Sequence, residues 1–350
     1  MRLTAFSLPL AARAAVTVLA ALALAACGGT TPTRPDASTE APLSSSATPI
    51  RVGIALGGGA AKGFAHIGVI KMLEANGFAP AVISGTSAGS VVGALYASGM
   101  NAFEMQEKAV ALDEAKIRDL QLSSGGLVLG QKLEDYVNEQ VRRKPLEQMA
   151  KPFVVVATRL EDGERTVFAR GNTGQAVRAS SSVPGVFQPV TIGKYHFVDG
   201  GIVSPVPVDA ARQLGADIVI AVDISNKARG QTPGNMLGAL NQSIAIMGQK
   251  LGQAELARAD VIITPQVLDI GPADFSQRAS AIVEGEKAAL AAMPKIRERI
   301  AQLQAERSKA VAQAQQKAAE AQHQACLDNR SRLQKLAGLA KMDDSCAAPK

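Results

Sequence analysis

The chain has 350 residues, 47% of them hydrophobic, and a formal net charge of +6. Such a chain can bury a large core, which excludes a largely disordered protein. The small positive excess is not gathered into a basic cluster, so the sequence gives no support for nucleic-acid binding.

The N-terminal segment, residues 1–26, has the pattern of an export signal. Arg2 and Arg13 precede an uncharged stretch, residues 14–26, that is too short for a usual membrane span. The stretch ends in small residues directly before Cys27, which resembles the signal of a bacterial lipoprotein. We therefore expect a signal peptide and a lipidated Cys27. The next residue is not the aspartate associated with inner-membrane retention, so we expect the periplasmic face of the outer membrane.

The following segment, residues 27–49, consists mainly of Thr, Pro, Ser and Ala. This composition cannot form a core, so we expect a disordered tether. Such a tether would let the next domain reach the lipid surface that holds Cys27. The membrane is thus an expected partner, through the lipid anchor.

A glycine-rich loop, residues 57–63, lies between a strand-like run and an amphipathic stretch. Consecutive glycines let backbone N–H groups come close to a phosphate or to a developing oxyanion. A dinucleotide fingerprint needs its third glycine where Lys62 stands, and a Walker A loop needs Ser or Thr where Gly63 stands. Because both spacings fail, an oxyanion hole is the better interpretation. The alternative is a purely structural turn.

The pentapeptide Gly-Thr-Ser-Ala-Gly, residues 85–89, follows an apolar run, residues 78–84. A strand that turns sharply into a helix at such a sequence is a nucleophile elbow, which would present Ser87 on a tight bend. The pentapeptide alone is a weak signal because Gly, Ser and Ala are abundant in this chain. Residues 78–103 contain no charge, and their small polar residues favour a buried strand, elbow and helix over a membrane span.

Further runs of β-branched residues are too short for helices. We expect central parallel strands at residues 152–158, 216–223 and 260–264. Helices are expected between them, notably at residues 132–143 and 208–214. This alternation predicts an α/β domain.

Asp199 stands between an aromatic strand end and two glycines. Taken alone, this pattern is typical of a turn whose carboxylate hydrogen-bonds its own backbone. A nucleophilic serine, however, needs a base. His66 lies on a predicted helix, His196 can point to either face of its strand, and His323 lies in a polar tail. Asp199 therefore remains the candidate base for Ser87.

The C-terminal part changes composition after about residue 293. Residues 295–323 contain Ala, Gln, Glu, Lys and Arg without Gly or Pro, which favours a helix. Its apolar stripe is short, so we expect a helix docked at its start and exposed later, open to a protein partner. In an exported protein Cys326 and Cys346 can form one disulfide, the alternative being two free thiols. No His, Cys and carboxylate cluster has the spacing of metal ligands, so neither a metal nor another cofactor is expected.

Taken together, the motifs resemble those of the patatin-like phospholipases. The resemblance runs over about residues 51–225 and rests on four motifs in order: Gly57–Gly63, Gly85–Gly89, Ala179–Phe187 and Asp199–Gly201. It implies a Ser-Asp dyad without a catalytic histidine and a three-layer α/β/α fold around a mostly parallel sheet. The implied substrates are acyl esters, mainly phospholipids, lysophospholipids and neutral lipids.

The same resemblance assigns roles to individual residues. Ser87 would be the nucleophile and Asp199 the proton acceptor. The N–H groups of the glycine loop would form the oxyanion hole, with a lysine at the basic position of the family. The residues implied for that hole are Gly57, Gly58, Gly59 and Lys62.

We therefore expect four segments: a signal peptide (1–26), a tether (27–49), a patatin-like catalytic domain (50–293) and a helical C-terminal extension (294–350). The expected activity is that of a phospholipase A or a lysophospholipase acting on membrane lipids. One alternative is a carboxylesterase or thioesterase of short substrates. Another is a non-catalytic lipid-binding scaffold, although a scaffold needs neither Ser87 nor Asp199.

Overall fold

The computed structural model describes residues 49–117, 119–123, 126–225, 234, 236–337 and 346. The expected signal peptide, Cys27 and nearly all of the expected tether lie outside this part of the chain. Of the two compact units of the chain, Met1–Ser45 and Ser46–Lys350, the second contains every described residue.

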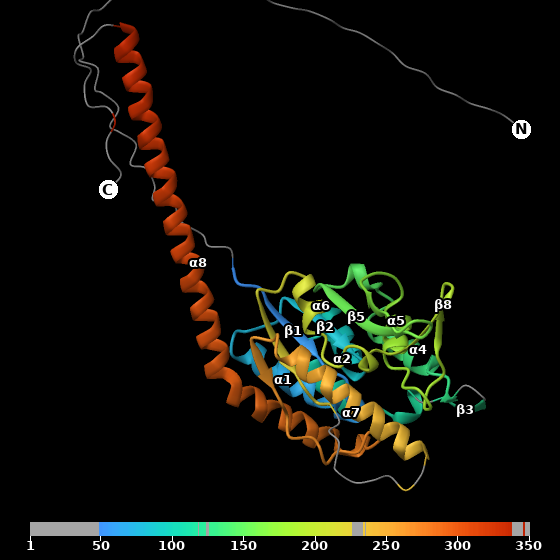
Figure 1. Ribbon diagram of the computed structural model, residues 1–350. Coiled ribbons are helices and arrows are strands. Elements are labelled where there is room, and N and C mark those ends of the chain that lie inside the picture. Colours follow the sequence, from blue (N-terminus) through green and yellow to red (C-terminus); the bar gives the residue numbers. More distant parts are fainter. Residues whose placement is uncertain are drawn as a thin grey trace, which may run out of the picture. The chain divides into compact units, whose positions relative to one another are not determined.

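An eight-stranded sheet forms the middle of this unit (Figure 1). Its order is β10-β9-β1-β2-β5-β8-β7, and β6 pairs with β5. The neighbours from β10 to β5 are parallel, whereas β6, β7 and β8 form antiparallel pairs. The strands are β1 (Val52–Leu56), β2 (Val82–Thr86), β5 (Phe153–Arg159), β6 (Arg165–Phe168), β7 (Val190–Ile192), β8 (Tyr195–Asp199), β9 (Ile218–Val222) and β10 (Val261–Ile263). A separate hairpin consists of β3 (Leu120–Ser123) and β4 (Gly126–Val128).

Helices cover both faces of the sheet, which makes the three-layer arrangement that the sequence predicts. On β1, Ile54 packs in a cluster with residues of α1, α2, α3 and α8, whereas its neighbour Ala55 packs with Val208 and Ala211 of α6. Because both faces are covered, β1, β2 and β9 are buried along their whole length. The helices are α1 (Ala65–Ala75), α2 (Ala88–Ala97), α3 (Ala102–Val110), α4 (Gln131–Gln140), α5 (Thr173–Ser180), α6 (Val208–Gln213), α7 (Met236–Leu256) and α8 (Arg278–Ala337).

The expected strands at residues 152–158, 216–223 and 260–264 appear as β5, β9 and β10. Two of them are not the central parallel strands that the sequence predicts. Among the described strands β10 pairs with β9 alone, at the edge of the sheet, and β5 is parallel to β2 but antiparallel to β6 and β8. β6 is antiparallel to β5 because a short turn joins the two strands, and such a turn can join only antiparallel strands.

The charge-free stretch at residues 78–103 contains β2 and α2, and both are largely buried in the domain. This confirms the interpretation as strand, elbow and helix. Within the described ranges, no helix is both long and apolar enough to cross a membrane.

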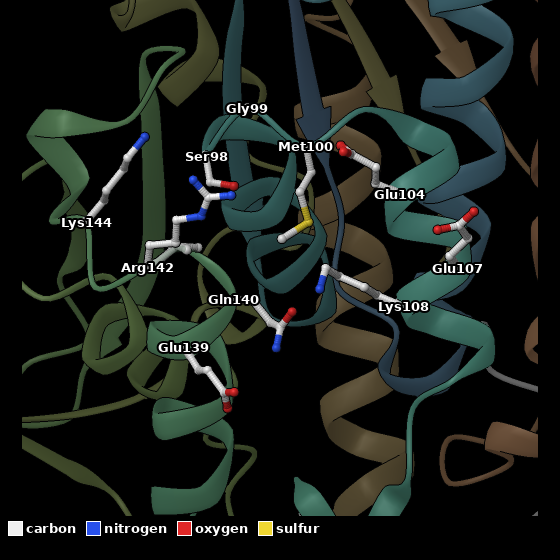
Figure 2. Close-up of a pocket in the computed structure, with 11 residues that line it drawn as sticks. Ser98, Gly99, Met100, Glu104, Glu107, Lys108, Glu139, Gln140, Arg142 and Lys144 are labelled. Carbon is white, nitrogen blue, oxygen red and sulfur yellow. The ribbon is translucent and has the colours of Figure 1, made fainter.

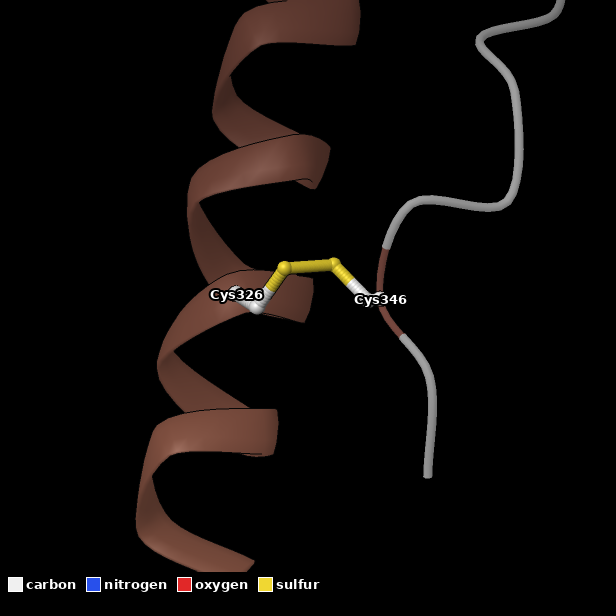
Figure 3. The surroundings of a disulfide bond; sticks show 2 residues. All are labelled: Cys326 and Cys346. Atoms are coloured by element: carbon white, nitrogen blue, oxygen red, sulfur yellow. A yellow bond between two sulfur atoms is a disulfide. The ribbon is translucent and has the colours of Figure 1, made fainter. Parts of the chain in front are cut away.

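The C-terminal helix α8 begins earlier than expected, at Arg278, and passes through Pro294. The expected boundary at 293/294 therefore lies inside one continuous helix. Its first part packs in the core, where Ile296 is fully buried, and an ion pair joins Arg307 to Asp217. Most of the later described side chains are exposed. Near its end, Cys326 forms a disulfide with Cys346 (Figure 3).

Two glycines let α1 and α8 touch backbone to backbone. A Cβ atom on Gly68 of α1 would lie 1.9 Å from the Ile282 carbonyl oxygen, and one on Gly285 of α8 would lie 2.0 Å from the Ala65 carbonyl oxygen. Both distances are far below van der Waals contact, so a side chain at either position would push the helices apart. This crossing fixes the start of α8 on the rest of the domain.

We expect Gly285→Ala to lower the free energy of unfolding by about 1–3 kcal/mol, because overpacking outweighs the gain in helix propensity. Thermal unfolding followed by circular dichroism measures this change. Gly271→Ala is the matched control, since its Cβ would lie an ordinary 3.6 Å from the Asp274 Cβ. An equal or higher midpoint for Gly285→Ala would contradict the close helix contact.

Candidate active site

Ser87 lies on a strained bend between β2 and α2. Its backbone has φ 52° and ψ −124°, a conformation that side-chain-bearing residues rarely adopt. The flanking glycines make the bend sterically feasible. A Cβ on Gly85 would lie 2.6 Å from the Gly89 carbonyl oxygen, and one on Gly89 would lie 2.1 Å from the Leu56 carbonyl oxygen. The geometry is that of a nucleophile elbow.

A second serine holds this bend in place. The Ser87 N–H donates to Ser180 Oγ at 2.8 Å, and Ser180 Oγ donates to the Val156 carbonyl at 2.5 Å. On the helix side, Ser90 Oγ donates to the Ser87 carbonyl at 2.6 Å. Ser180 lies in the Ala179–Phe187 motif, but nothing in three consecutive serines indicates which of them reaches the elbow. Sequence reasoning therefore missed its contact.

Asp199 meets Ser87 where the C-terminal ends of β2 and β8 converge along β5. Ser87 Oγ donates to Asp199 Oδ2 at 2.6 Å, and the Gly201 N–H donates to Asp199 Oδ1 at 2.7 Å. β5 sets this distance, because β2 and β8 pair with the same edge of β5, one after the other, while β6 pairs with the opposite edge. Val156 is the partner of Thr86, and the next residue, Ala157, is the partner of Asp199.

The carboxylate of Asp199 is buried, with 7% of the residue exposed. Burial raises its pKa from the usual 3.8 to about 6, while the hydrogen bonds from Ser87 and the Gly201 N–H act in the opposite direction. A carboxylate with a pKa near 6 is a stronger base than an exposed aspartate, yet it is still mostly ionised at pH 7. The site thus holds an acceptor that is suited to take a proton from a hydroxyl group.

The histidines make their contacts elsewhere. His66 Nε2 donates to the Gly57 carbonyl at 2.8 Å, and burial lowers the pKa of His66 to about 4, so its ring is neutral. His196 Nδ1 lies 2.8 Å from Glu161 Oε1 on the surface. His323 lies on the outer part of α8. These placements agree with the interpretation of Asp199 as the candidate base.

The glycine loop requires a correction. The Gly57 N–H donates to the Val222 carbonyl at 3.1 Å, and the Gly58 N–H donates to the Pro205 carbonyl at 3.0 Å. These two groups hold the loop against the sheet, so they cannot also serve an oxyanion. Their glycines are needed for close approach, since a Cβ on Gly58 would lie only 3.2 Å from Ser87 Cβ.

Other N–H groups lie at the starts of two helices that meet at this point. Gly59 caps a short 3-10 helix (Ala60–Phe64), and Ala88 begins α2. The first N–H groups of a helix have no acceptor within that helix. The two elements are in close contact, because a Cβ on Gly63 would lie 2.7 Å from Ala88 Cβ. Lys62 is buried in the short helix, and its own N–H donates to the Gly59 carbonyl.

A cavity of about 620 Å³ lies away from the serine, beyond the C-terminal end of α2 (Figure 2). Both acidic and basic side chains line it: Glu104, Glu107, Lys108, Glu139, Arg142 and Lys144. Such a mixed charged lining does not suit an acyl chain. Within the described residues, no group of His, Cys, Asp or Glu side chains is arranged to hold a metal ion.

An α/β sheet with a serine elbow and a buried carboxylate defines the class of serine hydrolases to which the site is similar. Residues 54–212 match the family model described as "Patatin-like phospholipase". The matched segment, residues 54–212, is therefore assigned to the patatin-like phospholipase family.

Relatives of this family align over about half of the chain. An uncharacterized NTE family protein of Mycobacterium tuberculosis is 36% identical over 182 residues, which is 51% of this chain and 51% of that protein. Human patatin-like phospholipase domain-containing protein 6 is 30% identical over 184 residues, which is 50% of this chain and 13% of that protein. The chain thus spans about half the length, or less, of these curated relatives.

Solved structures show a more distant similarity. The crystal structure of VipD from Legionella pneumophila is 15% identical, with a TM-score of 0.49, and the match covers 69% of this chain and 66% of that chain. ExoU of Pseudomonas aeruginosa, in complex with SpcU, is 15% identical, with a TM-score of 0.43, and the match covers 72% and 53%.

The raised pKa of Asp199 predicts a stability cost. In the unfolded chain this carboxyl loses its proton near pH 4, before it does so in the folded protein, so stability falls as pH rises from about 4 to about 6 and stays lower above that. We expect Asp199→Asn to increase the free energy of unfolding by roughly 2 kcal/mol at pH 8 and by little near pH 4. Urea unfolding at both pH values measures the difference.

Asp209→Asn is the control with the opposite sign. The hydrogen bonds from Arg258 lower the pKa of Asp209, so its replacement should destabilise the protein at pH 8. A gain for Asp199→Asn that is equal at both pH values would contradict a buried charge as its cause.

Proposed function

We propose that the protein is a serine acyl-ester hydrolase of membrane lipids, with Ser87 as nucleophile and Asp199 as general base. The observation that carries this proposal is the 2.6 Å hydrogen bond from Ser87 Oγ to the buried Asp199 Oδ2. This hydrogen bond is made at a strained elbow, and a serine with only a structural role would not need such a backbone conformation.

The geometry supports a two-step mechanism. Ser87 Oγ attacks the ester carbonyl carbon while its proton passes to Asp199 Oδ2, and the carbonyl oxygen becomes an oxyanion. The N–H groups at the starts of the two helices, those of Gly59 and Ala88, would stabilise that charge. When the tetrahedral intermediate collapses, the C–O bond to the alcohol breaks and Asp199 returns the proton to the leaving oxygen. Water then attacks the acyl-serine in the same way, releasing the fatty acid and restoring Ser87.

Phospholipid or lysophospholipid is the substrate class that we propose. The family match supports lipid substrates, and a related human protein has "phospholipase" in its name. Hydrolysis of short-chain esters or thioesters remains a distinct outcome, because the elbow and the carboxylate alone do not select an acyl length. Chain-length and headgroup preference are therefore properties for the assay to determine.

We also propose that Cys27 anchors the protein to the periplasmic face of the outer membrane. The support is the sequence pattern of residues 1–27. Cys27→Ala should prevent lipidation and move the protein from the membrane fraction to the soluble fraction of an expressing Gram-negative cell. Unchanged fractionation, together with no lipid on the wild-type protein by mass spectrometry, would contradict the anchor.

We expect Ser87→Ala to abolish labelling by a fluorophosphonate probe and to lower fatty-acid release by at least about 10³-fold. Asp199→Asn should stay folded and lose a similar factor, because an amide cannot accept the proton. Fatty-acid release is measured from phospholipid, lysophospholipid and short-chain esters. Ser98→Ala is the matched control, since Ser98 Oγ caps the far end of α2 and bonds only locally to the Leu95 carbonyl.

The outcomes of this experiment separate the candidate functions. Labelling with lipid hydrolysis supports the phospholipase, and labelling with hydrolysis of short esters alone supports an esterase. A folded wild-type protein that neither labels nor hydrolyses any substrate would overturn the enzyme and favour a lipid-binding scaffold.

The pH dependence tests the base. Asp199 must be ionised to accept the proton, and burial places its pKa at about 6. We therefore expect kcat/KM to fall about tenfold per pH unit below 6 and to be level above about pH 7. A profile that stays level down to pH 4.5 would show that the base is not a carboxylate with a raised pKa.

A further inference from the structure

A second buried carboxylate, Glu255, lies outside the Ser87–Asp199 pair. It stands in the last turn of α7, with 4% of the residue exposed. Ser204 Oγ donates to Glu255 Oε1, and the Val206 N–H donates to Glu255 Oε2 at 2.8 Å. The neighbouring cation, Arg258, donates instead to both carboxylate oxygens of Asp209, at 2.8 Å each. The two hydrogen bonds are thus the main compensation for the burial of Glu255, with a weaker attraction from Arg258.

The segment that Glu255 binds, residues 204–207, has few backbone donors of its own. Pro205 and Pro207 have no N–H group, so Ser204 and Val206 carry its only backbone donors. The Ser204 N–H donates to the Gly200 carbonyl at 2.8 Å, which leaves the Val206 N–H for Glu255. A carboxylate from α7 therefore replaces the sheet hydrogen bonds that a proline-rich segment cannot make.

The carbonyl groups of the same segment bind both halves of the candidate active site. Thr86 Oγ1, directly before the nucleophile, donates to the Ser204 carbonyl at 2.8 Å. The Gly58 N–H of the glycine loop donates to the Pro205 carbonyl at 3.0 Å. Ser84 Oγ, on β2, donates to the Pro207 carbonyl at 2.8 Å. One short segment thus sets the distance between the elbow and the glycine loop.

We propose that Glu255 is a positioning residue for ester hydrolysis, which holds residues 204–207 so that the oxyanion donors stay aligned with Ser87. The proposal rests on the hydrolase function proposed above. Glu255 touches neither substrate nor Ser87, and it acts through the carbonyl groups of the segment. Errors in the alignment of reacting groups on the order of 1 Å can slow a reaction about 100-fold.

The test uses the full-length protein and four variants: Glu255→Ala, Glu255→Gln, Ser204→Ala and Arg258→Ala. The first removes both hydrogen bonds, whereas glutamine can still accept from the Val206 N–H and should restore most of the rate. Arg258→Ala is the matched control, because it removes the ion pair to Asp209 near the end of α7 without touching residues 204–207.

Titration with a fluorophosphonate counts the active serines, so that kcat can be expressed per active serine. We expect Glu255→Ala to lower this kcat by roughly 10- to 100-fold and to leave KM within about twofold of wild type. The rate of fluorophosphonate labelling should fall by a similar factor. Ser204→Ala should cause a smaller loss, and the double variant should lose less than the product of the two single losses. A purely structural role would reduce the number of titratable serines while leaving kcat per serine unchanged. Wild-type kcat per serine and a wild-type labelling rate in folded Glu255→Ala would overturn the proposal.

Hydrogen exchange followed by mass spectrometry gives a readout that does not need activity. In Glu255→Ala, peptides that contain Gly58 and Val206 should exchange faster than in the wild-type protein, while Arg258→Ala should leave them unchanged. If the wild-type protein proves inactive, the proposed function fails but this measurement still decides the role of Glu255. Unchanged exchange at both sites would overturn it.

Discussion

The constraint on which the site depends is the register with which β2 and β8 pair, one after the other, with the same edge of β5. Ser87 and Asp199 are 112 residues apart in the sequence, so local structure along the chain cannot bring them together. β5 joins them because the pairs Val156–Thr86 and Ala157–Asp199 fall on adjacent residues of one strand. A shift of one residue in either pairing would turn the side chains to opposite faces and separate the hydroxyl from the carboxylate. The rest of the domain keeps β2, β5 and β8 paired in this register and buried.

The same site stores unfavourable free energy. Ser87 has a backbone conformation that costs on the order of 1–3 kcal/mol, and Asp199 holds a charge in a buried position. Both features persist because neighbouring groups stabilise them: Ser180 holds the Ser87 N–H, and the Gly201 N–H binds Asp199. A hydroxyl and a base that are held in contact need little rearrangement before attack, so the strain and the burial serve the proposed chemistry.

Residues 204–207 and Glu255 extend this principle to the glycine loop. Prolines in this segment remove the N–H groups with which a strand would bind its neighbours, yet the carbonyls of Ser204, Pro205 and Pro207 accept hydrogen bonds from β2 or from the glycine loop. The segment therefore aligns β2 and the glycine loop, although it is part of neither. Of its two backbone N–H groups, that of Ser204 binds the Gly200 carbonyl and that of Val206 binds Glu255, a buried carboxylate on α7.

The sequence by itself determined the elements whose signals are local. The apolar runs predicted β5, β9 and β10, the pentapeptide around Ser87 predicted the elbow, and the poor alternatives among the histidines indicated Asp199 as the base. What only the tertiary structure decided is which polar groups meet. Gly57 and Gly58 looked like oxyanion donors, but their N–H groups bind the Val222 and Pro205 carbonyls. Likewise, nothing local distinguishes Ser180 from its neighbours or connects Glu255 with residues 204–207. The physical reason is that strand and helix formation depend on neighbouring side chains along the chain, whereas a hydrogen-bond partner depends on the packing of segments that are distant in sequence.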